Sequence, residues 1–237
     1  MRINKFLASC GVASRRNSEQ YVLEGRVKVN GKVVTALATE INVDNDTVML
    51  DGKAVRLPHK HIYLMMNKLK GVVCTVSDER ERKTVMDYLP ANYKGKRIFP
   101  IGRLDYDSEG LLLLTTDGDL ANRLMHPSGD VGKTYICKVE GQVPEADLAK
   151  LRKGVELDGT RTKKAKITLL EFDGKLSRFE ITITEGRNRQ IRRMFETINK
   201  EVVFLKRVAI GNLKLGGLSR GESRDLRPEE IEYLMKL

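Results

Sequence analysis

Apolar and polar residues alternate near the N-terminus with the spacing of two short helices. One helix face, at positions i, i+3, i+4 and i+7, is formed by Ile3, Phe6, Leu7 and Cys10. Gly11 follows where a C-terminal glycine cap belongs, and Ser14 is suited to cap a second helix that runs to about Glu24. The pattern therefore predicts two helices joined by a tight turn.

After Gly25 the periodicity changes from helical to extended. Short runs rich in valine surround Asn30-Gly31 and again Asp51-Gly52, and such pairs tolerate the positive φ angles of a hairpin turn. The stretch 56–60 is polar and contains the helix breaker Pro58. We therefore expect a small helix-helix-strand domain over 1–57, a linker over 58–60 and a second domain over 61–237.

The second domain shows mainly the pattern of strands. We expect strands over 62–68, 71–76, 97–101, 111–116 and 134–139, an antiparallel pair over 155–170 and 176–184 around a Lys163-Lys164 turn, and further strands over 202–215. Pro228, followed by two acidic residues, opens a final helix that ends in Lys236, as the helix dipole favours.

Composition indicates a polyanionic partner and a reducing compartment. The 237 residues include 43 Lys and Arg against 32 Asp and Glu, a net charge of +11. The longest apolar run, about five residues from Ile62 to Met66, is far too short to span a bilayer. The N-terminus lacks the features of an export signal, and the three cysteines are widely spaced, as expected for free thiols in the cytosol.

Basic residues are concentrated in the N-terminal helix pair and first hairpin. Over 1–57 there are nine basic and six acidic residues, and the basic ones include Arg15, Arg16, Arg26 and Lys28. The order of the predicted helices and strands leaves three interpretations open: an RNA-binding module, a helix-turn-helix that reads DNA, and a solvated face without a ligand.

A polar loop lies between the apolar runs 97–101 and 111–116. Loops held between strands often carry catalytic side chains, because the scaffold fixes them and leaves them open to a ligand. The loop and the residues just after the second run contain five carboxylates within 15 residues, Asp105, Asp107, Glu109, Asp117 and Asp119. Each of them could equally be a turn or cap residue, and from spacing alone that reading is favoured.

The whole chain resembles the RsuA/RluB branch of RNA pseudouridine synthases. The resemblance includes an N-terminal S-four RNA-binding module over 2–57 and the loop Gly102-Arg103-Leu104-Asp105 with its continuation to Gly118. It extends to Asn67-Lys68, to the stretch 120–128 that ends in His126-Pro127-Ser128, to Lys133-Thr134-Tyr135 and to the stretch 185–195. Ser108 and Thr116 depart mildly from the family pattern, and neither removes a reacting group. The resemblance implies an α+β fold with a mixed, largely antiparallel sheet and flanking helices.

The resemblance also implies roles for individual residues. Asp105 is the essential carboxylate, which is ionised at neutral pH and acts as nucleophile or as stabiliser of a positive sugar. Tyr135 stacks on the uracil, and Ile191 packs under the flipped base. Arg103 enters the RNA stack where the target base has left, and Lys133 contacts phosphate.

The stretch 185–195 offers a cationic partner for Asp105. At 100° per residue, Arg189 and Arg193 lie opposite the apolar face of the expected helix, whereas Arg192 lies at its edge and can be partly buried. We therefore expect Arg192 to pair with Asp105, and Arg189 and Arg193 to follow phosphates. An ordinary amphipathic helix with a solvated basic side is the alternative.

Together these features predict an enzyme that isomerises one uridine of ribosomal RNA. The RluB type, which acts on large-subunit RNA, is favoured, with the RsuA type on small-subunit RNA and a non-catalytic RNA-binding or ribosome-assembly protein as alternatives. We expect no cofactor and no metal, a partner that is ribosomal RNA either free or in a pre-ribosomal particle, no membrane association, a monomeric state and a cytoplasmic location.

Overall fold

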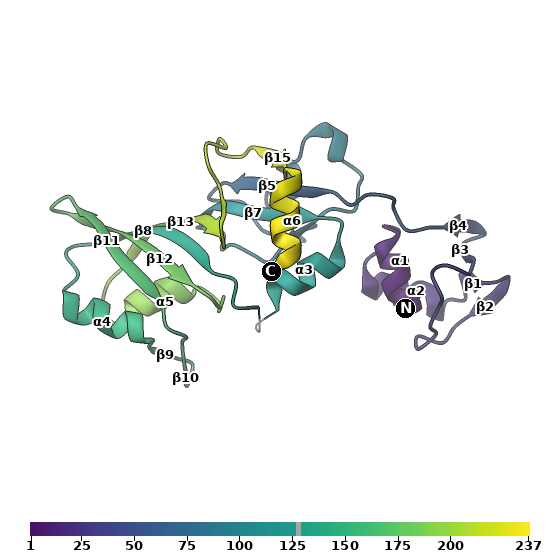
Figure 1. Cartoon of the computed structure of the whole chain (residues 1–237), viewed down its shortest axis with the longest axis horizontal. Coiled ribbons are helices and arrows are strands. Elements are labelled where there is room, and N and C mark those ends of the chain that lie inside the picture. Colours follow the sequence, from purple (N-terminus) through teal and green to yellow (C-terminus); the bar gives the residue numbers. More distant parts are fainter. Residues whose placement is uncertain (127–128) are drawn as a thin grey trace.

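The computed structural model describes residues 1–126 and 129–237, and its N-terminal elements form a separate small unit at one end of the molecule (Figure 1). Helices α1 (Ile3–Ser9) and α2 (Arg15–Leu23) pack on a four-stranded sheet in the order β2-β1-β3-β4. These strands span Val27–Val29 (β1), Lys32–Val34 (β2), Val48–Leu50 (β3) and Lys53–Val55 (β4). Their small core includes Ile3, Phe6, Leu7, Val22, Val27, Ile41 and Val48.

The predicted local signals of this unit are confirmed. The Ser14 side chain caps α2 by accepting a hydrogen bond from the Asn17 backbone N–H at 3.0 Å. Asn30 and Gly31 have φ angles of 51° and 80°, which are the left-handed values that the first hairpin turn requires.

The rest of the chain is built around a nine-stranded mixed sheet. Seven strands follow the order β11-β12-β8-β13-β7-β5-β15, with β6 paired to β7 and β14 paired to β13. Their bounds are Tyr63–Lys68 (β5), Phe99–Ile101 (β6), Glu109–Thr115 (β7), Lys133–Glu140 (β8), Lys166–Phe172 (β11), Leu176–Ile183 (β12), Val202–Ile210 (β13), Leu213–Lys214 (β14) and Ser223–Asp225 (β15). A separate two-stranded hairpin contains β9 (Glu156–Leu157) and β10 (Thr160–Arg161). The predicted α+β class with a largely antiparallel sheet is confirmed.

The two halves of the sheet meet where β7 runs parallel to β13. The pairing covers Lys206 with Glu109 and Arg207 with Gly110. Gly110 has a φ of 103°, and a Cβ atom there would lie 2.1 Å from the carbonyl oxygen of Arg207. Only glycine allows the strands to approach this closely.

Helices cover the sheet at several points. They are α3 (Gly118–Met125), α4 (Glu145–Lys153), α5 (Gln190–Glu196) and α6 (Pro228–Lys236), and two short 3₁₀ helices span Val85–Tyr88 and Ala91–Tyr93. Helix α5 packs on β12, where the rings of Phe195 and Phe179 lie 5.7 Å apart. The final helix was predicted from Pro228 and is confirmed, whereas α3 and α4 were not predicted.

Two strand predictions are wrong. Residues 71–76 form no regular strand, and only Val73 makes an isolated bridge, to Thr84. The predicted strand over 155–170 is divided into β9, β10 and β11, so the turn between the antiparallel pair β11 and β12 lies at Asp173-Gly174 and not at Lys163-Lys164.

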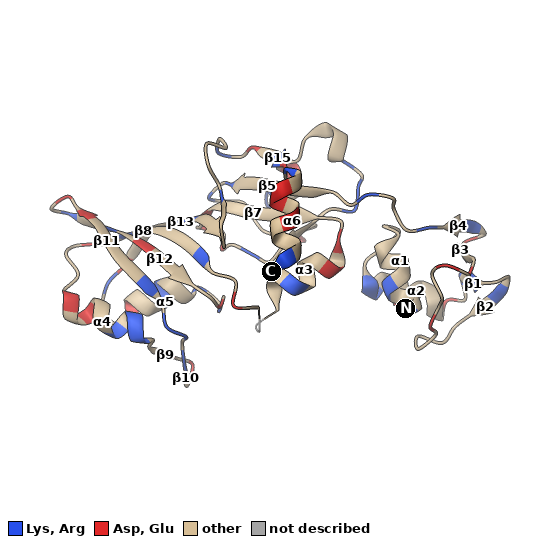
Figure 2. Ribbon diagram, viewed as in Figure 1, with Lys and Arg blue, Asp and Glu red and all other residues tan. Residues whose placement is uncertain are grey.

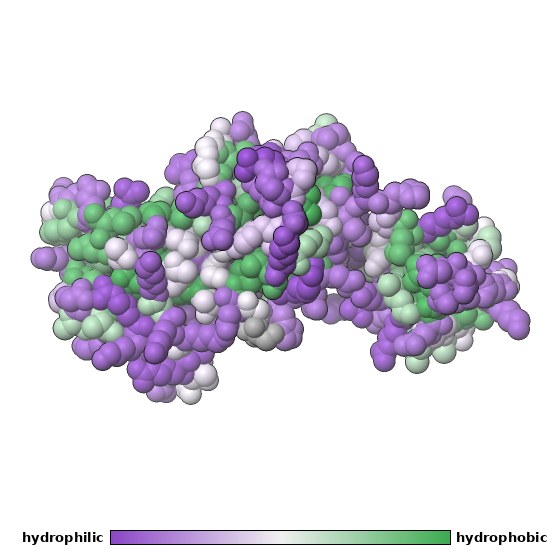
Figure 3. Space-filling view, in the orientation of Figure 1, coloured by the Kyte–Doolittle hydropathy of each residue, from purple (hydrophilic) through white to green (hydrophobic). Residues whose placement is uncertain are grey.

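Polar side chains cover much of the face of the molecule that Figure 3 shows. Figure 3 shows hydrophobic areas over the lobe of β8, β11 and β12, in the central part around α6 and over the N-terminal unit, set among hydrophilic residues. Basic residues lie on α1 and α2 and around α5, β9 and β10 (Figure 2). Among the residues described, we find no helix with the length and apolar character needed to cross a membrane.

Candidate active site

The loop that carries Asp105 connects β6 to β7, as the sequence predicts. Gly102 opens the loop with a φ of 72°, and the Ser108 backbone N–H donates a hydrogen bond to the carbonyl oxygen of Asp105 at 3.1 Å. The Leu104 backbone N–H donates to the Sγ atom of the buried Cys74 at 3.3 Å. The loop therefore has a fixed backbone and turns the Asp105 side chain toward a cavity described below.

A buried lysine at the end of β5 holds this loop from below. The Nζ atom of Lys68, a residue only 1% exposed, donates hydrogen bonds to the carbonyl oxygens of Leu69 (2.9 Å), Asp105 (3.0 Å) and Ser108 (2.8 Å). Burial lowers the pKa of Lys68, while nearby acidic groups that include Asp105 act in the opposite direction. The sequence indicated Lys68 only as part of a motif and gave it no role.

Asp107 ties the loop to helix α5. Its carboxylate lies 3.1 Å from the Nη1 atom of Arg189 and 3.2 Å from the Nη2 atom of Arg192. Arg192 also donates to the carbonyl oxygen of Val202 at 2.5 Å. These contacts hold the two segments of the site, far apart in the sequence, against each other.

The predicted pairing of Arg192 with Asp105 is therefore wrong. Helix periodicity placed Arg192 correctly at the edge of the apolar face, where its side chain is 8% exposed. The carboxylate that reaches its guanidinium belongs to Asp107, two residues farther along the loop, because the carbonyl oxygen and carboxylate of Asp107 both face α5.

Half of the twelve expected site residues line one cavity of about 520 Å³, which we call the Asp105 cavity. Tyr135 of β8 is 7% exposed, and Ile191 of α5 is 3% exposed. The six expected site residues that line it are Arg103, Asp105, Lys133, Tyr135, Arg189 and Ile191. Burial, together with the charge of Arg207, lowers the pKa of Lys133. The structure thus joins a carboxylate, an aromatic ring and several cations in one concave site.

Other expected residues lie elsewhere. Arg193 forms an ion pair with Asp158, in the turn between β9 and β10, with Nη2 2.6 Å from Oδ1. Arg192, which stands behind the loop, does not line the Asp105 cavity. Of the motif residues, His126 lines the cavity, whereas Pro127 and Ser128 lie outside the described residues.

The four basic residues predicted in the N-terminal unit differ in their surroundings. Arg15, Arg16 and Lys28 are exposed. Arg26 is engaged within the unit, because its Nη2 atom lies 2.7 Å from Asp51 and its guanidinium lies 4.1 Å from the centre of the Tyr21 ring.

Arg207 is a cavity residue that the sequence analysis missed. It is 4% exposed, donates from Nε to the carbonyl oxygen of Leu111 at 2.7 Å, and has an Nη2 atom without a hydrogen-bond partner among the described residues. It pairs in register with Tyr135 on β8 and with Gly110 on β7, so it lies at the centre of the site. The available signal was a charged residue at an inward position of an alternating strand, between Leu205 and Ala209.

The chemistry that this cavity can support follows from its side chains. A buried ring offers a stacking surface for a planar base, and surrounding cations favour a phosphate backbone. The carboxylate can act as a nucleophile or stabilise positive charge. No group of three or more metal-ligating side chains occurs within residues 1–126 and 129–237.

Comparisons with known proteins agree with this site. The family model described as RNA pseudouridylate synthase matches residues 62–197, and that of the S4 domain matches residues 1–48. A relative from Bacillus subtilis (strain 168), "Ribosomal large subunit pseudouridine synthase B", is 45% identical over 100% of this chain and 96% of its own length. An "Uncharacterized RNA pseudouridine synthase" from Aquifex aeolicus (strain VF5) is 42% identical over 100% of this chain and 94% of its own.

A solved structure agrees as well. The crystal structure of a pseudouridylate synthase, 31% identical, covers 99% of each chain with a TM-score of 0.71. The family model, the full-length relatives and the fold thus all indicate the same family. The chain belongs to the RNA pseudouridylate synthase family and is an RNA pseudouridine synthase with an N-terminal S4 domain.

Proposed function

We propose that this enzyme isomerises a specific uridine of large-subunit ribosomal RNA to pseudouridine. The observation that carries the proposal is the position of Asp105 in a cavity that it shares with Tyr135 and Ile191. The full-length similarity to a relative named for the large ribosomal subunit supports the choice of RNA. In this reaction the bond from C1′ to N1 of uracil breaks and a bond from C1′ to C5 forms, with no change in composition.

The side chains of the cavity suggest a division of labour. We assign Asp105 as the carboxylate that acts on the nucleotide, Tyr135 as the ring that stacks on the uracil, and Ile191 as the residue beneath it. Arg103, which is exposed at the mouth of the loop, would fill the gap left by the extruded base. Arg192 holds the loop in place through Asp107 and does not touch the reacting atoms.

Phosphates of the substrate strand would meet the basic residues around the cavity. Lys133 and Arg189 line it, whereas Arg193 pairs with Asp158 outside the cavity and would have to leave that carboxylate to meet a phosphate. Arg189 already pairs with Asp107, so a phosphate would compete with that carboxylate for its guanidinium. Such contacts supply affinity that falls as salt rises.

We further propose that residues 1–57 form an RNA-binding domain, joined by the linker 58–60 to a catalytic domain over 61–237. Arg15, Arg16 and Lys28 are exposed and able to meet phosphate, whereas Arg26 would first have to leave Asp51. Changing Arg15 and Arg16 to Gln should reduce the salt dependence of RNA binding by about 1 to 2 in log-log slope. An unchanged slope would mean that this face does not contact phosphate.

Location, assembly state and substrate form are also part of the proposal. We propose a cytoplasmic monomer that acts on ribosomal RNA, either free or within a pre-ribosomal particle. The high content of basic residues supports a polyanionic partner.

Mapping pseudouridines in ribosomal RNA from cells with and without this protein tests the function. We expect one large-subunit position to lose pseudouridine when the protein is absent and to regain it when the purified enzyme is added to that RNA. Loss at a small-subunit position would redirect the enzyme to that RNA. Identical maps would contradict the proposal.

A further inference from the structure

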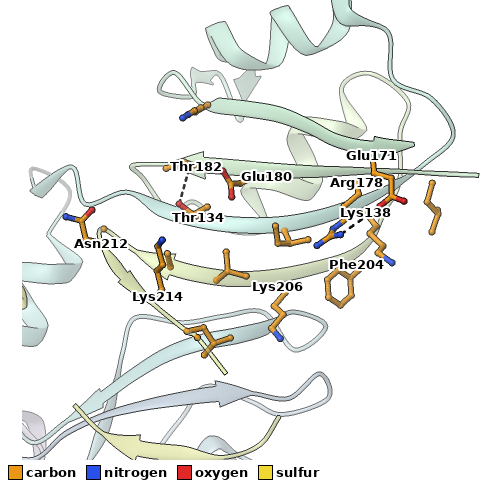
Figure 4. A pocket seen from close by; sticks show the side chains of 18 of the residues that line it. Thr134, Lys138, Glu171, Arg178, Glu180, Thr182, Phe204, Lys206, Asn212 and Lys214 are labelled. Carbon is orange, nitrogen blue, oxygen red and sulfur yellow. Dashed lines mark hydrogen bonds and ion pairs between the residues drawn. The ribbon is translucent and has the colours of Figure 1, made fainter. Parts of the chain in front are cut away.

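The sheet has a second face, opposite the Asp105 cavity, which is open and basic. Strands β12, β8 and β13 alternate, so Tyr135 and Cys137 face α5 while Thr134, Ile136 and Lys138 face the other way. The outward residues line a cavity of about 1040 Å³, which we call the sheet-face cavity (Figure 4). It is separate from the site described above, although both are built on the same strands.

Strand register arranges the centre of this cavity in rows. Lys138 stands between Arg178 on β12 and Phe204 on β13. In the next row Ile136 stands between Glu180 and Lys206. Figure 4 shows the side chains of Lys138, Phe204 and Lys206 near one another on this face.

Cations predominate in the sheet-face cavity. It is lined by Lys138, Lys166, Arg178, Lys206 and Lys214. Among these five, only Arg178 forms an ion pair within the described chain, to Glu171 at 3.9 Å, and Lys138 lies near Asp173 and helps to lower its pKa without an ion pair to it. The four lysines can therefore still bind a ligand.

The acidic side chains of the same cavity are fewer, and two of the three are already engaged. Glu171 pairs with Arg178. Asp173 accepts hydrogen bonds from the backbone N–H groups of Leu176 and Lys175, which lower its pKa. Glu180 is the third carboxylate. The excess of unpaired lysines is complementary to a polyanion.

Apolar and hydrogen-bonding groups lie between these charges. Phe204 is half-buried and lines the cavity, so part of its surface is open to a ligand. Ile136 and Val208 extend this apolar floor, and Thr134 and Asn212 add polar groups at its far end. An aromatic ring flanked by lysines on an open sheet is suited to single-stranded nucleic acid, whose bases stack while its phosphates pair with cations.

The two cavities lie on opposite faces of the sheet but reach the same ends of β8 and β13. Lys133 and Ile210 line the Asp105 cavity, and their neighbours Thr134, Ala209 and Gly211 line the sheet-face cavity. An RNA strand that passes around this end of the sheet reaches both cavities. From Thr134 to Lys138 the floor runs about 14 Å along β8, the length of about four stacked nucleotides.

We propose that the sheet-face cavity is a second RNA-binding site, which holds a single-stranded segment next to the modified nucleotide by stacking on Phe204 and by ion pairs with Lys138 and Lys206. The inference rests on the proposed function in one respect, since it takes the substrate RNA as the ligand. The site raises affinity for extended RNA and takes no part in the reaction.

The test compares two RNA probes. One is a short stem-loop that contains the uridine found by mapping, and the other is the same stem-loop with oligouridine tails on both sides. The proteins are the wild type, the variant K138Q/K206Q, and the matched control K94Q/K96Q, which removes two exposed lysines that do not line the sheet-face cavity. Affinity and its salt dependence are measured for each pair, together with single-turnover pseudouridine formation on the short probe.

We expect the wild type and K94Q/K96Q to bind the tailed RNA at least about tenfold more tightly than the short probe. This gain is what two additional phosphate contacts and one additional stacked base supply. K138Q/K206Q should lose most of this gain, with a salt slope lower by about 1.4, and keep its rate on the short probe. F204L, which keeps an apolar side chain in the sheet, should bind the tailed RNA at least about fivefold more weakly.

Three results would overturn the proposal: no tail-dependent gain in the wild type, equal losses in K138Q/K206Q and K94Q/K96Q, or unchanged binding of tailed RNA by both K138Q/K206Q and F204L. Each of these differs from failure of the proposed function, which would appear as an absence of pseudouridine in the short probe with every protein.

Discussion

Replacing Lys68 by Met should loosen the loop that carries Asp105 without removing any group that touches the substrate. Methionine keeps most of the apolar stem of lysine in the core and removes the ammonium group, which donates to three backbone carbonyls. The carbonyl oxygen of Asp105 also accepts a hydrogen bond from the Ser108 backbone N–H. The loss of the ammonium group therefore affects mainly the carbonyl oxygens of Leu69 and Ser108.

The structure sets the size of the effect. A buried carbonyl without a partner costs about 1–3 kcal/mol, so two of them cost about 2–6 kcal/mol. Removing a buried charge offsets part of that loss, because the ammonium no longer has to be desolvated. We therefore expect the free energy of unfolding to fall by about 1–3 kcal/mol. A displacement of the Asp105 carboxylate by about 1 Å lowers the rate about 100-fold.

The assays are denaturant unfolding, RNA affinity and single-turnover pseudouridine formation. Lys70→Met is the matched control, since it removes the same charge from an exposed position two residues away. We expect Lys68→Met to bind RNA like the control and to react much more slowly. If both variants unfold and react alike, Lys68 does not position the loop and our account of its three hydrogen bonds is incorrect.

Two further variants test the scaffold. Gly110→Ala should lower the free energy of unfolding by about 2–5 kcal/mol, because the new Cβ meets the Arg207 backbone. The control Gly118→Ala, with nothing within 4 Å of its Cβ, should leave that free energy almost unchanged. Equal stability of the two variants in denaturant would contradict the close strand contact. Two hydrogen bonds from Arg224 lower the pKa of Glu230 from 4.5 to about 2, so its carboxylate stabilises the fold above pH 4.5 and this contribution disappears as pH falls toward 2. Glu230→Gln should therefore lower the free energy of unfolding at pH 7 by up to about 3 kcal/mol and by almost nothing near pH 2; a difference independent of pH would argue against this ion pair.

Local signals in the sequence were sufficient for most of the secondary structure. Ser14, Asn30-Gly31 and Pro228 each act through their own backbone neighbourhood, so their effects can be predicted without knowing the fold. Helix α4 was missed although Glu145 and Asp147 stand in its first turn and three basic residues in its last. The strand expected over 71–76 did not form because extended sequence needs a neighbouring strand, and the chain supplies Val73 with only one bridge.

Contacts between distant segments could not be predicted in the same way. Periodicity correctly indicated that Arg192 is buried at a helix edge, but it could not say which loop residue would meet it. The pairing with Asp107 depends on the path of the loop 102–108 past α5. That path depends in turn on the hydrogen bonds that Lys68, on strand β5, donates to the loop. Arg207 was missed for a related reason, since its place beside Tyr135 follows from the register of β13 on β8.

The central claim is that the carboxylate of Asp105 acts directly on the nucleotide. Asp105→Asn has nearly the same shape and removes one negative charge, so it should keep the fold and the affinity for RNA. Single-turnover pseudouridine formation on the mapped ribosomal RNA is the decisive measurement. We predict no product from Asp105→Asn at an RNA occupancy equal to that of the wild type, and product at the wild-type rate would contradict the account.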